Sequence, residues 1–172
     1  LLFSATLPDK IIQLSKKYLS SPRRVDIKAD NVLLTNIEHD ILNIDHNKKY
    51  KELLDQLAKR EGSVLIFAKT KFGTQRMAKK LCEDGFKSDA LNGNLTQNKR
   101  DKVMSDFRLK KFKVLVATDI ASRGLDVDHI EHVINYDLPQ VAEDYIHRIG
   151  RTGRAGSKGS TICFVSPEEQ SI

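Results

Sequence analysis

The sequence predicts an α/β fold in which helices cover both faces of a mostly parallel sheet. Short apolar runs of strand length alternate with segments whose apolar residues recur at helical spacing, a pattern typical of βαβ units. Residues 64–68 are continuously apolar, as expected for a strand covered on both faces. Polar clusters follow several of the runs, and in such sheets ligands bind at the carboxyl ends of the strands. These clusters therefore predict a functional face.

The predicted strands are short and begin near residue 36. We expect them at residues 37–44, 64–68, 88–91, 114–117, 132–136 and 161–165. The first is the least regular, because its apolar residues change phase along the segment. Its length and its three isoleucines still favour a strand over a helix.

Helices are predicted between these strands, at residues 48–60, 72–84, 96–107 and 140–149. Gly85 ends the second of them. Thr96 is expected to cap the third, which buries Val103, Met104 and Phe107.

The N-terminal part is predicted to lie outside this domain. Residues 1–3 have the character of the tail of a buried strand, and Pro8 suits the first turn of a helix that ends near Leu19. Residues 20–36 show little periodicity, apart from one short extended piece at 25–27. Because the chain starts without methionine, we expect a fragment. It would comprise the end of a preceding domain (1–19), a linker (20–36) and one complete domain (37–172).

The composition limits the classes of protein to which the chain can belong. The net charge of +6 suits an anionic partner, although 23 acidic residues make the surface mixed. No apolar run is long enough to span a membrane and no signal peptide is visible, so we expect no membrane partner. Cys82 and Cys163 lack a CxxC pattern and are expected to be reduced core residues of a cytoplasmic protein. The five histidines lack metal-ligand spacing beyond a weak 129/132 pair, so no metal site is predicted.

Three arginines form the most unusual motif. Arg148, Arg151 and Arg154 stand three apart, with glycines between them on the same period. No acidic residue lies between positions 144 and 168, so we expect these guanidinium groups to meet an external anion such as a phosphate. We expect a helix that ends near Gly150, followed by a tight loop. The alternative is an ordinary basic helix end that complements the dipole.

Two further clusters suit phosphate binding. Residues 118–126 follow a buried strand and contain hydroxyl side chains, an arginine and a glycine. Asp126 could accept a hydrogen bond from a ribose. The alternative there is that Asp119 caps the strand end and pairs with Arg123. Gln97 and Arg100 lie on the first turn of a helix, where backbone amides attract anions, although Arg100 could equally be a solvated side chain.

Parts needed for nucleotide hydrolysis are missing. The chain has no G-x-x-x-x-G-K-[ST] phosphate loop, no paired acidic motif after a strand, and no serine or cysteine nucleophile with a plausible base. By itself the chain is therefore predicted to be inactive.

Together these motifs resemble those of the DEAD-box ATP-dependent RNA helicases of superfamily 2. Ser4-Ala5-Thr6 is similar to the SAT motif that closes the first domain of the family. Residues 64–71, with Phe67 and Thr70, resemble motif IV, and Gln97-x-x-Arg100 resembles the QxxR element. Residues 117–126 resemble motif V and residues 147–154 resemble motif VI. One departure is Asn92-Gly93-Asn94, where many members have His-Gly-Asp.

The resemblance implies a RecA-like C-terminal domain, a three-layer sandwich related to P-loop NTPases. Its partners would be the RNA backbone, with little sequence specificity, and the N-terminal RecA-like domain of the same protein. That missing domain would hold most of the ATP and Mg²⁺, so no cofactor is expected to bind this fragment tightly. The alternatives are a non-catalytic RNA-binding or regulatory module, or a superfamily 2 DNA helicase.

The resemblance also implies residue roles. Arg151 and Arg154 would act as arginine fingers on the γ-phosphate, and Gly124 and Asp126 would contact the nucleotide. His147 and Arg148 would organise the domain interface. The residues implied at the RNA backbone are Thr70, Gly93, Gln97, Arg100, Thr118 and Arg123.

Overall fold

The computed structural model describes residues 9–23, 25, 36–122, 127, 129–153 and 157–169. The chain divides into two compact units, residues 1–30 and 31–172. In the first unit, helix α1 spans Asp9–Ser15 and ends four residues before the expected Leu19. Leu14 on this helix is half exposed, so the segment has little apolar packing to extend it. The strand tail expected at residues 1–3 lies outside the described residues, as does most of the extended piece at 25–27.

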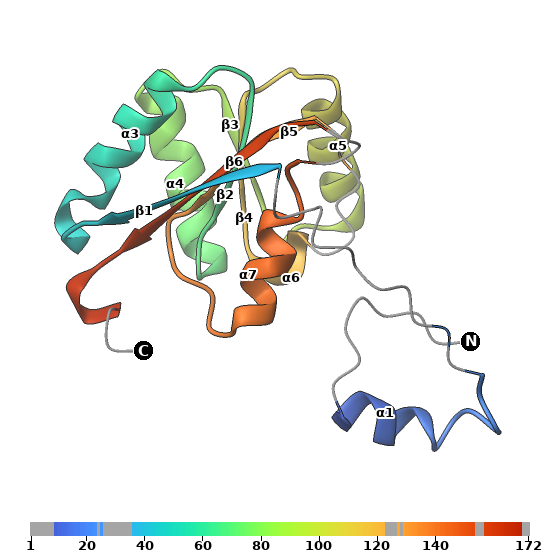
Figure 1. Cartoon of the computed structure of the whole chain (residues 1–172). Coiled ribbons are helices and arrows are strands. Elements are labelled where there is room, and N and C mark those ends of the chain that lie inside the picture. The colour runs from blue at the N-terminus through green and yellow to red at the C-terminus, as the bar shows by residue number, and fades with distance from the viewer. Residues whose placement is uncertain are drawn as a thin grey trace. The chain divides into compact units, whose positions relative to one another are not determined.

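Six parallel strands form the sheet of the second unit, in the order β1-β6-β5-β2-β4-β3. Their carboxyl ends therefore share one edge; in Figure 1, β1 and β6 point to the left, and helices α6 and α7, which follow β4 and β5, lie below the sheet. The prediction of a parallel sheet is confirmed, with strand ends that shift by one or two residues. The strands are β1 (Ile37–Asn43), β2 (Ser63–Phe67), β3 (Ser88–Leu91), β4 (Val114–Ala117), β5 (Ile130–Asn135) and β6 (Gly159–Val165).

Helices cover both faces of this sheet, as predicted. On one face, Leu53 and Leu57 of α3 and Leu81 of α4 pack on β2, β4 and β5. On the other face, Phe107 of α5 and Ala121 of α6 pack on the opposite sides of the same strands. The helices are α3 (Lys49–Lys59), α4 (Lys71–Glu83), α5 (Gln97–Arg108), α6 (Asp119–Ser122) and α7 (Ala142–Ile149), with 3₁₀ turns at His46–Lys48 and Pro167–Glu169. The short helix α6 begins at Asp119, where the sequence predicted only a strand end.

Two local expectations are wrong. Thr96 stands at the N-cap position of α5, but its side chain makes no capping hydrogen bond. Cys82 is exposed, and its sulfur lies 3.2 Å from the Ser88 carbonyl oxygen, whereas Cys163 is buried as expected. Apolar neighbours in sequence predicted burial for Cys82, but position 82 faces away from the sheet on α4.

A buried lysine joins the start of α3 to the end of the sheet. Lys49 is 1% exposed, and its ammonium group donates hydrogen bonds to the carbonyl oxygens of Tyr136 (3.3 Å) and Phe164 (3.1 Å). It also forms an ion pair with Glu169 at 2.8 Å. Partial burial alone would raise the pKa of the Glu169 carboxyl, but hydrogen bonds from Lys49 and Ser166 outweigh it and hold this pKa below its usual value.

We expect Lys49→Met to lower the free energy of unfolding by about 2 to 3 kcal/mol, because two carbonyls and a carboxylate lose a charged donor. The ion pair with Glu169 contributes its full stability above the pKa that this carboxyl has in the unfolded chain. This stability is lost as the pH falls through the lower pKa that the carboxyl has in the folded chain. The difference between parent and variant should therefore shrink in acid. Urea denaturation followed by circular dichroism measures it. Lys48→Met is the control, since the Lys48 side chain is 67% exposed; equal losses in both variants would contradict the assignment.

Candidate functional site

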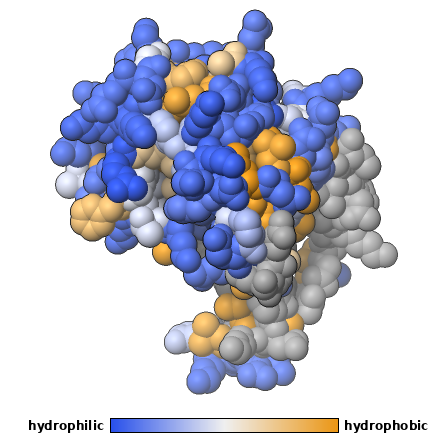
Figure 2. Space-filling model, turned by 90° about the vertical axis from the view of Figure 1, so that its left-hand side faces the viewer, coloured by the Kyte–Doolittle hydropathy of each residue, from blue (hydrophilic) through white to orange (hydrophobic). Residues whose placement is uncertain are grey.

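The polar loops gather at the carboxyl edge of the sheet. The segments that follow β2, β3, β4 and β5 all emerge there, because every strand pair is parallel. Figure 2 views the molecule from the left-hand side of Figure 1 and shows a mainly hydrophilic surface with separate hydrophobic patches. The site is described below loop by loop.

The loop after β2 is held by its neighbour after β5. The Lys69 backbone N–H donates to the Asp137 carboxylate at 2.7 Å. Thr70, which is exposed, caps α4 by accepting a hydrogen bond from the Gly73 backbone N–H at 2.9 Å. A capping threonine uses its oxygen as an acceptor and keeps its O–H free to donate, which suits contact with a phosphate oxygen.

The turn after β3 is organised by Asn92. This side chain is fully buried, and its amide donates to the Thr74 hydroxyl at 3.0 Å and to the Lys71 carbonyl at 3.3 Å. Its side-chain oxygen accepts from the Asn94 backbone N–H at 3.0 Å. A Cβ atom on Gly93 would stand 3.3 Å from the Lys71 side chain, a tight approach. Asn92 therefore serves the fold and leaves the Gly93 backbone exposed.

The residues predicted on α5 and after β4 meet at α6. Arg100 donates through Nη2 to the Ala121 carbonyl oxygen at 2.9 Å, so it braces the C-terminal end of α6. The buried Thr118 accepts the Ser122 N–H at 3.0 Å through its carbonyl and so begins this helix. Gln97 is exposed and donates to Asp101 at 2.7 Å, within α5. The structure thus brings Arg100 and the Thr118–Ser122 segment together.

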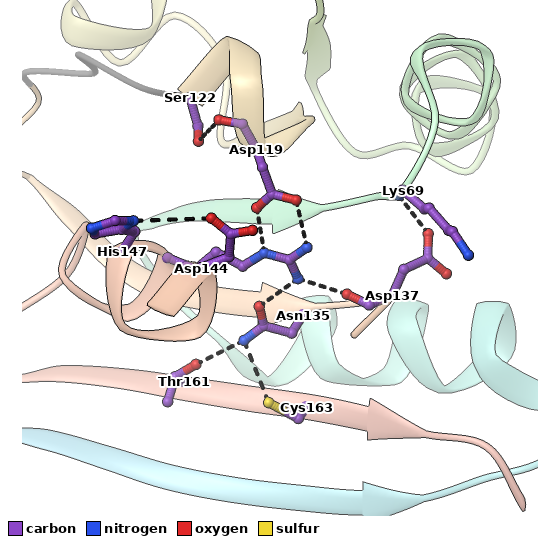
Figure 3. Close-up of polar contacts among 10 residues, drawn as sticks. Lys69, Asp119, Ser122, Asn135, Asp137, Asp144, His147, Thr161 and Cys163 are labelled. Carbon is purple, nitrogen blue, oxygen red and sulfur yellow. Dashed lines mark hydrogen bonds and ion pairs between the residues drawn. The ribbon is translucent and has the colours of Figure 1, made fainter. Parts of the chain in front are cut away.

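Arg148 on α7 forms a cluster with a side chain of α6, a side chain of β5 and a backbone carbonyl after β5. Its guanidinium holds the Asp119 carboxylate through Nε (2.6 Å) and Nη2 (2.8 Å). Nη1 donates to the Asn135 side-chain oxygen at 3.0 Å and to the Asp137 carbonyl at 2.6 Å. Figure 3 shows Asp119, Asn135 and Asp137 converging, with Thr161 below Asn135 and joined to it by a hydrogen bond. We call Arg148, Asp119, Asn135 and Asp137 the Arg148 cluster.

The expectation that all three guanidinium groups meet an external anion is wrong for Arg148, whose carboxylate partner is distant in sequence. Its side chain is 3% exposed, and its guanidinium carbon lies 4.8 Å from the centroid of the Phe67 ring. The partner, Asp119, is 29 positions away in sequence and reaches it only because β4 and β5 flank β2. A role at a domain interface stays a prediction, but this guanidinium is engaged within the domain.

Arg151 lies in the turn that follows the end of α7. The helix ends at Ile149 with Gly150 as its C-cap, as predicted, and the half-buried Arg151 follows in a turn. The Thr152 hydroxyl lies 2.7 Å from the Ile130 carbonyl oxygen and 2.9 Å from that of Glu131, which fixes this turn to β5. Gly153 has a φ of 67° and packs against Ile37, so a side chain there would be strained.

Helix α7 also contacts the edge strand. The Tyr145 hydroxyl lies 2.9 Å from His39 Nδ1 on β1, and burial, together with Cys163, raises the pKa of Tyr145 to about 12. His147 is half exposed and lies 4.0 Å from the Asp144 carboxylate.

Four predicted residues fall outside the described part of the chain: Arg123, Gly124, Asp126 and Arg154. Among the described residues there is no group of three or more potential metal ligands. Nor does any described helix have the length and apolar character needed to cross a membrane. Sequence reasoning placed residues 135–137 among the polar clusters at strand ends but assigned Asn135 no role in the site. Its polar side chain at the end of an apolar strand was the available signal.

Comparisons with known proteins identify this arrangement. The helicase conserved C-terminal domain family matches residues 45–156. The chain is 41% identical over 171 residues to the ATP-dependent RNA helicase DbpA of Bacillus subtilis, covering 99% of this chain and 36% of that protein. It is 43% identical to the ATP-dependent RNA helicase RhlB of Pseudomonas syringae, covering 98% of this chain and 43% of that protein. The chain thus spans well under half of these relatives.

Solved structures agree with the sequence relatives. A DEAD box protein from Methanococcus jannaschii superposes with a TM-score of 0.77 at 43% identity, over 98% of this chain and 46% of that one. Saccharomyces cerevisiae Dbp5 bound to RNA and ADP BeF3 gives a TM-score of 0.80 at 33% identity, over 98% and 46%. The RecA-like fold is therefore confirmed. The chain belongs to the helicase conserved C-terminal domain family, as a C-terminal RecA-like domain of the DEAD-box RNA helicase type.

Proposed function

We propose that this domain binds the RNA backbone along the carboxyl edge of its sheet, as half of an ATP-dependent RNA helicase. The observation that carries this proposal is the convergence of the loops after β2, β3 and β4 on one edge. Thr70, Gly93, Gln97, Arg100, Thr118 and Arg123 would line or support the strand. Contacts to phosphate and sugar position a strand without reading its sequence, so binding should be salt-dependent and weakly specific.

The ATP would be shared with an N-terminal RecA-like domain. Arg151 and Arg154 would contact the γ-phosphate, and Gly124 and Asp126 the nucleotide's ribose side, while the N-terminal domain would hold most of the ATP and Mg²⁺. His147 and Arg148 would support this interface. Residues 1–19 would be the end of that preceding domain, 20–36 the linker and 37–172 the C-terminal domain. Closure of the two domains would then bring the arginines to the phosphate only when both ligands are bound, coupling hydrolysis to separation of short duplexes.

RNA-stimulated phosphate release from ATP tests this proposal. We expect release from the intact protein and none from this chain alone, which lacks a phosphate loop. Adding this chain to the intact protein without RNA is the background control. Phosphate release by the isolated chain would contradict the proposal that the N-terminal domain holds most of the ATP. An intact protein that binds RNA but releases no phosphate would favour a non-catalytic RNA-binding module, and equal stimulation by DNA of the same sequence would favour a DNA helicase.

A further inference from the structure

A separate pocket opens beside Thr70, on the face of the sheet that α3 and α4 cover. Its volume is about 470 Å³. Its floor is formed by Ala68 after β2 and Tyr136 after β5. One wall is a stripe of α4, and the opposite wall comes from the 3₁₀ turn and first turn of α3. The wall residues are Gly73, Arg76, Met77 and Lys80 on α4, and His46 and Tyr50 opposite.

The topology explains why a recess forms here. Strands β2 and β5 are neighbours, but the chain leaves β2 for α4 on one face and leaves β5 for α7 on the other. Loops that diverge in this way leave a crevice at the carboxyl ends of the strands, the usual place for ligands in open α/β sheets. The α4 residues of the wall are spaced three and four apart, so they share one side of the helix.

The lining combines cations with aromatic rings. Arg76 and Lys80 share the pocket with one carboxylate, Asp137, which already accepts the Lys69 N–H at 2.7 Å. The Lys80 ammonium lies 3.7 Å from the centroid of the Tyr50 ring, a cation–π contact. Arg76 and Lys80 are exposed, so their charged ends remain accessible to a ligand.

Both tyrosine rings are held in place. The Tyr50 hydroxyl donates to the Asp84 carboxylate at 2.6 Å, and burial together with Asp84 raises the pKa of this phenol far above neutrality. The Tyr136 ring packs against Phe164, with centroids 5.9 Å apart. Preformed aromatic surfaces beside a guanidinium and an ammonium group suit a ligand with both a flat ring and a phosphate.

We infer that this pocket takes one nucleotide of the bound RNA strand, with its phosphate on Arg76 and Lys80 and its base against the tyrosine rings. The inference rests on the proposed function, because Thr70 lines both this pocket and the proposed strand path. A free nucleotide offers the same chemistry. The strand is favoured because Thr70 makes the pocket continuous with that path. The pocket therefore extends the RNA site from the carboxyl edge onto the α3–α4 face.

The test uses the intact protein and oligouridylates lengthened one nucleotide at a time, in one series at the 5′ end and in another at the 3′ end. We compare Arg76→Ala/Lys80→Ala with Lys59→Ala/Lys79→Ala. The control also removes two positive charges from the face that α3 and α4 cover, at residues of these helices that do not line the pocket. Fluorescence anisotropy at several salt concentrations reports the affinities.

We expect the pocket variant to bind the long RNA about tenfold more weakly, with a salt slope smaller by about 0.7 for the lost phosphate. Its affinity for the shortest RNA that the parent protein binds should be unchanged, and so should the control variant on every RNA. The added affinity should appear at one particular length, where the strand reaches the pocket. In the pocket variant that step should be absent.

Other results would overturn the inference. Equal losses in pocket and control variants would indicate a general charge effect, and an unchanged affinity on long RNA would remove the subsite. A loss on the shortest RNA would assign both cations to the main strand path and leave the proposed function standing. Uridine monophosphate that binds the parent protein, but not the pocket variant, would assign the pocket to a free nucleotide. A parent protein that binds no RNA would overturn the proposed function and this inference together.

Discussion

Arg148→Ala should lower the free energy of unfolding of this chain by about 3 to 5 kcal/mol, because it leaves a carboxylate in the domain without its buried partner. The guanidinium makes four hydrogen bonds, two of them to Asp119. Removing it also strips a donor from the Asn135 side chain and from the Asp137 carbonyl. Urea denaturation followed by circular dichroism is the appropriate measurement, since the chain contains no tryptophan.

Two variants make this result specific. Arg148→Lys keeps the charge but not the planar fork, so we expect a smaller but clear loss of stability. Arg76→Ala removes an exposed arginine and should stay within about 0.5 kcal/mol of the parent chain. A double-mutant cycle with Asp119→Ala measures the coupling, which should be large for residues in contact. If Arg148→Ala unfolds like the parent chain, the Arg148 cluster does not stabilise the domain.

Arg151→Ala should lower activity and leave stability almost unchanged, whereas Arg148→Ala should lower stability. In the intact protein we expect RNA-stimulated phosphate release to fall by about 10³-fold or more, the loss typical of an arginine finger in phosphoryl transfer. The stability of the domain should change little, because Arg151 follows α7 and is only half buried. Single-turnover phosphate release, measured beside RNA binding, separates the two effects.

The matching control is Lys158→Ala, which removes an exposed cation seven positions after Arg151. It should leave phosphate release within about twofold of the parent protein. A finger acts on the chemical step, so Arg151→Ala should retain RNA affinity while losing turnover. Parallel loss of RNA affinity and turnover in Arg151→Ala would instead place this residue in the RNA site.

The order of strands and helices was predictable because it depends on local patterns. Continuous apolar runs identified β2 and β4, whose described residues are all buried. Gly85, with a φ of 89°, marked the turn after α4. The errors arose where packing, rather than the local pattern, decided the outcome: α1 lacks the apolar packing that would extend it, and Cys82 faces outward despite apolar neighbours.

The site was predictable to a smaller extent. Parallel topology alone indicated which edge would collect the polar loops, and that prediction is confirmed. The pairing of Arg148 with Asp119 was not predictable, because it depends on which strands are neighbours and on the reach of a long side chain. The buried ion pair of Lys49 was not predictable for the same reason, since its partners Tyr136, Phe164 and Glu169 are far away in sequence. The roles of Arg151 and of the RNA-facing residues remain predictions.

The Arg148 cluster also limits how such domains can be recombined. Its members come from three stretches of chain, at residues 119, 135–137 and 148. In a chimera whose crossover falls between positions 119 and 148, Asp119 would come from one parent and Arg148 from the other. A crossover in the turn between α4 and β3 would leave the cluster intact. In gene shuffling, residues 119–148 should therefore be inherited as one block.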